Sequence, residues 1–196
     1  YYTKPNDQQK AVIAAYKSLN NDLFKMTGND AATAKKKMEA AFSIENQIAK
    51  VSYDQVKSRD PQANYHPMTW EQLLKNYPGI DWNYLLKASG YPNNGGKVDV
   101  GQPEPVHEVE KILATAPLDA LKAYMELAVI SSSAGMLSDN FSDRNFEYTK
   151  VAYGVQQQQP RWKRALSFVQ GIMGEAVGKL YVQKYFPESS KQRMIT

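Results

Sequence analysis

Histidine is the residue type most directly tied to metal and acid–base chemistry, and this sequence contains two, His66 and His107. His107 opens the segment His107-Glu108-Val109-Glu110-Lys111. In the pattern His-Glu-x-x-His, two histidines one helical turn apart bind one metal ion while the glutamate activates water. Lys111 stands in the second histidine position, and its ammonium group does not bind zinc at neutral pH. The segment therefore predicts a solvent-facing first helical turn rather than a metal site.

The other chemistry-bearing residues lack the partners that a site would need. His66 precedes Pro67 in a polar linker without a second ligand nearby, which is typical of a surface histidine. The run 131–133 is three serines without an elbow motif or a histidine partner, so packing and hydrogen bonding at a helix end are expected. The segment 94–96 (Asn-Gly-Gly) lacks the lysine and helix of a phosphate loop. No catalytic or metal-binding residue is therefore predicted in this chain.

Composition excludes several classes of protein. The 196 residues include no cysteine, which excludes a disulfide scaffold, a thiolate zinc site and a cysteine nucleophile. The net charge of +4 comes from 24 basic and 20 acidic residues that are well mixed, so no nucleic-acid partner is expected. No window approaches the ~18 consecutive apolar residues of a membrane span. The start at Tyr1, without an initiator methionine, suggests a piece of a longer chain or a processed product.

Residues 160–186 form the longest uninterrupted helical signal in the sequence. The helix that they predict is expected to be central to the packing of the other elements. Pro160 suits a first helical position and Pro187 stops the pattern. Apolar residues recur there at alternating steps of four and three, which places one stripe on a helix: Trp162, Leu166, Val169, Met173, Ala176 and Leu180. The spacing predicts one long helix across a small domain.

Three glycines lie on a neighbouring stripe of the same helix. This stripe contains Gly171, Gly174 and Gly178, and it continues to Tyr181 and Tyr185. Each glycine inside a helix costs about 1 kcal/mol relative to alanine, so a close helix–helix crossing is expected at this face, ahead of a ligand groove. The helix is therefore expected to be buried on two sides. The predicted structural core of this motif is Trp162, Gly171, Gly174, Gly178, Leu180 and Tyr181.

Capping residues, breakers and helical periodicity predict further helices around this one. They are expected at about residues 7–27, 30–60, 69–76, 81–90, 103–114 and 117–135, with a weakly helical end after Pro187. A further helix is expected to begin at Ser138 or Ser142 and to end at Tyr153. Val98 and Val100 mark at most one short strand. The polar stretch 58–68 is expected to separate a helical hairpin, residues 1–60, from residues 61–196. The predicted fold class is all-α, a multi-helix and mainly antiparallel lobe.

Two of these helices carry stronger expectations about burial. The helix at 30–60 is expected to present Val51 and Val56 on its inner face, together with Met38, Phe42 and Ile48. The helix at 117–135 is apolar nearly all round, which predicts deep burial.

Several motifs resemble the neprilysin and endothelin-converting enzyme family of zinc metallopeptidases. In the C-terminal part these are Tyr153-Gly154, the run 160–165 (Pro-Arg-Trp-Lys-Arg-Ala), the run 173–182 (Met-Gly-Glu-Ala-Val-Gly-Lys-Leu-Tyr-Val), Phe186 and Ser190-Lys191. Earlier in the chain, the matching residues are Tyr1-Tyr2, Arg59-Asp60-Pro61, Tyr65, Met68-Thr69, Leu73, Asp81-Trp82, Leu137-Ser138 and Phe146. The resemblance covers essentially the whole chain in order.

The resemblance implies two mainly helical lobes, one carrying zinc and the other capping a chamber that admits oligopeptides. This chain resembles the helices leading out of the N-terminal region and much of the capping lobe. It implies a segment of a zinc metalloendopeptidase, inactive by itself, whose partner is the remaining peptidase lobe of the same polypeptide. The family's zinc ligands and other catalytic motifs would follow this stretch, so no catalytic residue and no bound zinc are expected here.

One departure from the family pattern concerns the source of the protein. Ala165 stands where animal members have a disulfide-forming cysteine, which implies a bacterial relative, exported to the periplasm or the cell surface. An alternative of another class is a stand-alone helical binding or adhesion module without peptidase activity. The coding sequence after Thr196 separates the two, because only a peptidase would continue into His-Glu-x-x-His.

Overall fold

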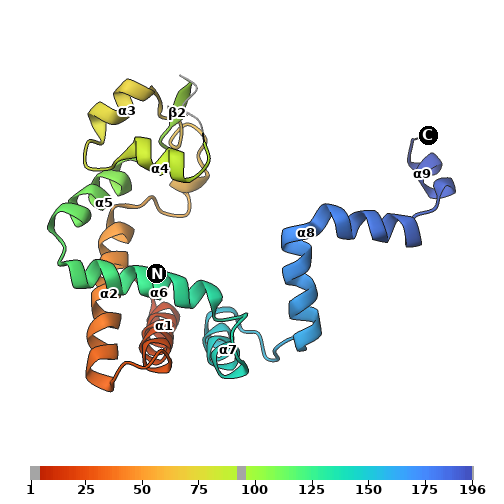
Figure 1. The fold of residues 1–196 in the computed structure, drawn as a ribbon, viewed down its shortest axis with the longest axis horizontal. Coiled ribbons are helices and arrows are strands. Elements are labelled where there is room, and N and C mark those ends of the chain that lie inside the picture. Colours follow the sequence, from red (N-terminus) through yellow and green to blue (C-terminus); the bar gives the residue numbers. More distant parts are fainter. Residues whose placement is uncertain (1–4, 92–95, 196) are drawn as a thin grey trace. The chain divides into compact units, whose positions relative to one another are not determined.

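The fold is mostly helical, in agreement with the predicted class. The computed structural model describes residues 5–91 and 96–195, which form two compact units, one up to Gly154 and one from Val155 onward. Figure 1 shows the order of the elements along the chain. Tyr1-Tyr2 and residues 94 and 95 of the segment that was not expected to form a phosphate loop lie outside the described residues.

The first two helices begin and end where local signals place them. Helix α1 (Asp7–Met26) starts with the expected capping box, because Asn6 and Gln9 exchange side-chain to backbone hydrogen bonds. Gly28 then takes a positive φ of 94°, which turns the chain toward α2 (Ala31–Val51). The Asp30 side chain accepts N–H hydrogen bonds at the start of α2. Both helix starts therefore satisfy backbone N–H groups that have no partner inside the helix.

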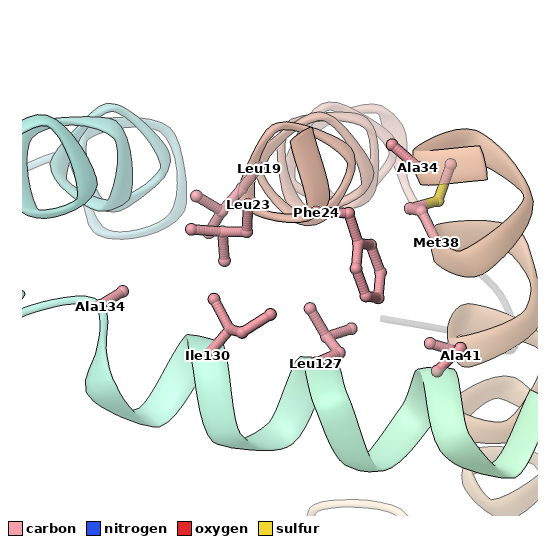
Figure 2. Packing of buried hydrophobic residues seen from close by; sticks show 10 residues of the cluster. Leu19, Leu23, Phe24, Ala34, Met38, Ala41, Leu127, Ile130 and Ala134 are labelled. Atoms are coloured by element: carbon pink, nitrogen blue, oxygen red, sulfur yellow. The ribbon is translucent and has the colours of Figure 1, made fainter. Parts of the chain in front are cut away.

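Helices α6 (Leu118–Ser133) and α7 (Asp139–Tyr153) pack against this pair. Figure 2 shows Leu127 and Ile130 of α6 pointing toward Leu23 and Phe24 of α1. Leu23 and Phe24 have no exposed surface. Burial of large apolar side chains of this kind stabilises the fold by about 1.5–3 kcal/mol each. The core of this unit therefore lies between α1, α2 and α6.

A second, smaller cluster is built from short elements. These are β1 (Pro67–Thr69), α3 (Trp70–Asn76), α4 (Trp82–Ala88), β2 (Lys97–Asp99) and α5 (Pro103–Thr115). The strands pair antiparallel, with Met68 opposite Val98. Leu73, Tyr77 and Val100 are buried between them. The sequence predicted β2 and not β1, because a three-residue strand inside a proline-containing linker is too short to show an alternating pattern.

Two predictions about helix ends and faces were wrong. Helix α2 ends at Val51, and the chain then forms a 3₁₀ turn at Lys57–Arg59 rather than continuing to residue 60. Asp54 accepts the N–H groups of Val56 and Lys57, which stabilises a turn in place of another helical turn. Val56, expected on the inner face, is 81% exposed.

The expected deep burial of the helix at 117–135 is met on one face only. Ala123, Leu127 and Ile130 are buried against the core, whereas Met125 and Val129 are more than 60% exposed. A helix that is apolar all round needs neighbours on every side. Within the described residues up to Gly154, α1 and α2 cover one side of α6.

The second unit contains α8 (Arg161–Tyr185) and α9 (Glu188–Ile195). The predicted long helix exists, but it is not uninterrupted, since Met173 leaves helical geometry with φ −122° and ψ 33°. This kink lies between Gly171 and Gly174, where the lack of a Cβ makes the distortion less costly. Within the second unit the described part of α8 has no buried residue, so the burial of this helix on two sides stays a prediction.

The boundary between the two units differs from the lobe boundary that the sequence predicted for an intact enzyme. Residues of α1 and α2 share a core with α6 and α7, and the change of unit falls at Gly154. The division into residues 1–60 and 61–196, which refers to the lobes of an intact enzyme, stays a prediction. Among the helices of the described residues, none has the length and apolarity that a membrane crossing requires.

Candidate functional site

Side chains of the His107 segment contact a neighbouring loop. The imidazole Nδ1 of His107 lies 3.1 Å from one carboxylate oxygen of Glu110, whose other oxygen accepts the Gly79 N–H at 2.6 Å. Lys111, at the second histidine position, pairs with Glu108 at 3.3 Å. Glu110 therefore fixes the Pro78-Gly79 turn against α5, a role that the sequence did not suggest.

Tyr77 lies beneath this segment. Its ring is buried and stacks on the His107 ring at a centroid distance of 4.6 Å. Its backbone carbonyl accepts the Trp82 indole N–H at 2.9 Å. Burial, followed by the negative charges of Glu104 and Glu110, raises the pKa of the Tyr77 hydroxyl. A tyrosine in this environment stays neutral and packs, which supports a structural role for the group.

His66 and the serine run also take structural positions. The backbone N–H of His66 donates to Asp99 at 2.7 Å, next to the β1–β2 pair. The hydroxyls of Ser131 and Ser132 donate to backbone carbonyls of the preceding helical turn, which confirms the expected hydrogen bonding near a helix end. Across residues 5–91 and 96–195, no three His, Asp or Glu side chains gather closely enough to hold a metal ion.

The sequence analysis missed a polar network between α1, α2 and α7. The Tyr16 hydroxyl donates to Glu45 at 2.7 Å, and burial followed by this hydrogen bond raises the pKa of Tyr16. Arg144 reaches from α7 to Asp22 at 2.8 Å and to Ser18 at 2.9 Å. Helical periodicity marks only apolar faces, so charged pairs between distant helices leave no signal in the sequence.

A groove of about 620 Å³ runs between α2 and α6, a volume in the range of ligand sites. Its floor includes the methyl groups of three alanines, and its rim carries Lys36, Lys37 and Lys122. Lys37 is neutralised by Glu126 at 2.7 Å across the groove. Lys36 and Lys122 have no ion pair with any described residue of the chain. The groove lining therefore combines three alanines with three lysines and two carboxylates, those of Asp119 and Glu126.

The residues predicted as the structural core of α8 lie on an open surface of the second unit. Trp162, Leu180 and Tyr181 are each more than 60% exposed. A Cβ built on Gly171, Gly174 or Gly178 would meet no atom within 4 Å. Within the second unit, the close crossing inferred from the glycines therefore has no partner, and it stays a prediction.

Comparison with known proteins gives one consistent result. A family model described as peptidase family M13 matches residues 1–196. Rat endothelin-converting enzyme 1 is 27% identical over 97% of this chain, which spans 26% of that protein. The neutral endopeptidase of Lactobacillus helveticus is 26% identical over 97% of this chain and 29% of its own length.

Solved structures agree with the sequence relatives. The zinc metalloprotease of Mycobacterium tuberculosis in its open state superposes with a TM-score of 0.90 at 31% identity, over 99% of this chain. The same protease in complex with an inhibitor gives a TM-score of 0.88 at 30% identity. In both cases this chain spans 30% of the solved chain. It therefore corresponds to between a quarter and a third of these longer proteins.

Proposed function

Because this chain belongs to peptidase family M13, we propose that it is one segment of a zinc metalloendopeptidase that hydrolyses oligopeptides. In the intact enzyme the segment would form the helical lobe that caps the active-site chamber and restricts the size of substrates. The observation that carries the proposal is the match over residues 1–196, together with the 31% identity and TM-score of 0.90 to a zinc metalloprotease.

The residues that the structure describes do not fit a zinc site. The second position of the His107 motif is Lys111, and His107 itself faces Glu110. Zinc needs three or four nitrogen, sulfur or oxygen ligands converging on one point. The metal and the catalytic groups would therefore be supplied by the remaining polypeptide. The contribution of the present segment is to exclude bulk water and large substrates.

The open surface of α8 supports a partner within the same polypeptide. A kinked helix with exposed Trp162, Leu180 and Tyr181 carries a large apolar area that water disfavours. Its glycine face would admit another backbone at close range. We therefore place the remaining peptidase lobe against α8 in the intact enzyme.

The site of action that we propose is outside the cytoplasm, in the periplasm or at the cell surface of a bacterium. Bacterial relatives from Lactobacillus and Mycobacterium are among the matches, and the chain contains no cysteine. A signal or membrane anchor would belong to other parts of the protein.

The test is peptide hydrolysis by the full-length enzyme. We expect it to cleave a short fluorogenic peptide, to lose this activity with a zinc chelator, and to recover it when zinc is added back. Residues 1–196 expressed alone are the matched control, expected to show neither turnover nor stoichiometric zinc by metal analysis. Zinc-dependent turnover by residues 1–196, or an inactive full-length protein that continues without His-Glu-x-x-His, would contradict the proposal and favour a binding or adhesion module.

A further inference from the structure

Helix α8 bends once along its length, at Met173. This residue has φ −122° and ψ 33°, whereas the rest of the helix keeps helical geometry. Figure 1 shows the two straight stretches that result, which we call the first arm (residues 161–172) and the second arm (residues 174–185). Sharp bends in helices arise at proline, at glycine or serine pairs, at bulges or at inserted groups. Neither arm contains a proline, so we attribute the bend to Gly171 and Gly174 on its two sides.

Within the second unit, no side-chain contact holds the two arms at a fixed angle. The rings of Tyr181 and Tyr185 contact each other at a centroid distance of 5.2 Å, but both belong to the second arm. Along residues 162–185, the other side-chain hydrogen bonds, ion pairs and ring contacts likewise stay on one side of the bend. Burial does not fix the angle either, because this unit buries no residue of α8.

The backbone at the bend can change its dihedral angles at little cost. A Cβ built on Gly171 or Gly174 would meet no atom within 4 Å, so no packed neighbour opposes a movement there. Glycine also tolerates a wider range of φ and ψ than other residues. A return of Met173 to helical φ and ψ would straighten the helix. Bent and straight forms therefore differ in a few dihedral angles beside small residues, which is typical of hinges.

We propose that residues 171–174 form a hinge in α8, and that the two arms take more than one angle in the intact protein. A lobe that caps a chamber must move to admit a peptide, and a hinge in one of its long helices allows such a movement. The inference rests on the proposed function only for the use of this movement. The movement itself does not depend on catalysis.

The experiment measures distances between two spin labels in the full-length enzyme, from which any other cysteine has been removed. One pair, Ala165→Cys with Gln183→Cys, spans the bend at exposed positions. The matched control pair, Ala32→Cys with Lys50→Cys, has the same separation in sequence, at exposed positions of the unbent helix α2. A straight helix covers about 27 Å over this separation. Pulsed electron paramagnetic resonance resolves distances of this size.

We expect one narrow distance near about 27 Å for the control pair, and a distribution at least about twice as wide, reaching shorter distances, for the pair across the bend. A distribution across the bend that is as narrow as the control would overturn the proposal. At a short distance it would indicate a rigid bent helix, and near about 27 Å a rigid straight one. Lys163→Cys with Lys179→Cys repeats the measurement if the first labels disturb folding.

The two glycine positions are compared by Gly171→Ala and Gly178→Ala. Each variant adds one methyl group in open space on α8, but only Gly171 adjoins the bend. Because alanine favours the helix more than glycine does, we expect Gly171→Ala to narrow the distribution and shift it toward about 27 Å, and Gly178→Ala to leave it unchanged. Equal distributions in the two variants would overturn the assignment of the hinge to residues 171–174.

The peptide assay on the same full-length protein separates this inference from the proposed function. An inactive protein with a broad distribution across the bend would contradict the proposed function and support the hinge. An active protein with a narrow distribution would do the reverse.

Discussion

At the scale of single residues, the groups that resemble catalytic ones form structural contacts. Glu110 binds the Gly79 N–H at 2.6 Å and faces His107, which stacks on buried Tyr77. The lysine in place of a second histidine predicts that this segment is not a metal site. The sequence could not indicate that Glu110 fixes a turn 31 residues earlier in the chain, because that contact depends on the tertiary fold.

Asp30 provides a pH-dependent test at the same scale. Its carboxylate accepts the N–H groups of Thr33 and Ala32 at 2.9 Å and the Thr33 hydroxyl at 2.7 Å. These hydrogen bonds, the Thr33 backbone bond first, hold the pKa of Asp30 below its usual value. The Asp30 carboxylate therefore stabilises the folded state fully above pH ~4, the ordinary pKa of an aspartate. This stabilisation is lost as the pH falls through the folded-state pKa of Asp30, which is lower.

We expect Asp30→Ala to lower the Tm at pH 7 and to have a smaller effect at an acid pH below the folded-state pKa of Asp30, where the native carboxyl is protonated. Thermal unfolding followed by circular dichroism at both pH values measures this. Glu39→Ala, at an exposed position without a capping role, is the control. A Tm difference for Asp30→Ala that is the same at both pH values would rule out the charged cap.

At the scale of elements, local signals predicted where most helices begin and end but not what covers them. The capping boxes at Asn6 and Thr69 and the stops near Gly28 and Gly154 are satisfied within a few residues of sequence. The burial of α6 and α8 depends on partners distant in sequence. An apolar stripe shows which face of a helix avoids water, and it does not identify the neighbour.

The polar contacts between helices also could not be predicted from the sequence. Arg144 and Asp22 lie 122 positions apart, and Lys37 and Glu126 lie 89 apart. Single charged residues on otherwise ordinary helix surfaces carry no periodic signal. The α2–α6 groove, which depends on the same packing, therefore became visible only in the structure.

The substitution Gly174→Leu compares the surroundings of α8 in residues 1–196 with those in the full-length enzyme. In residues 1–196 the new side chain meets open space, so we expect a gain of up to about 1 kcal/mol from helix propensity. In the full-length enzyme we expect a loss of about 1–3 kcal/mol, because the side chain would overpack against the peptidase lobe. Chemical unfolding of both proteins measures the two changes, with Gly174→Ala as the smaller matched variant. The same sign in both proteins would contradict a lobe packed on this face.

At the scale of the whole molecule, the chain matches one part of longer proteins. Its first unit has a well-formed core of apolar residues from α1, α2 and α6. The exposed faces of α6 and α8 are large for surfaces that remain in water. Both observations agree with a segment that matches relatives along 26–30% of their length. We therefore propose that the exposed face of α8 contacts the remaining polypeptide, which would hold the zinc site.

The most direct test of this account is the size of substrate that the full-length enzyme accepts. One cleavable sequence is offered as a short free peptide and as a tethered loop of a stable folded carrier protein, and both cleavage rates are measured under the same conditions. The account predicts zinc-dependent cleavage of the free peptide and an intact carrier, because a capping lobe admits only small substrates. Cleavage of the folded carrier at a rate comparable to that of the peptide would contradict it.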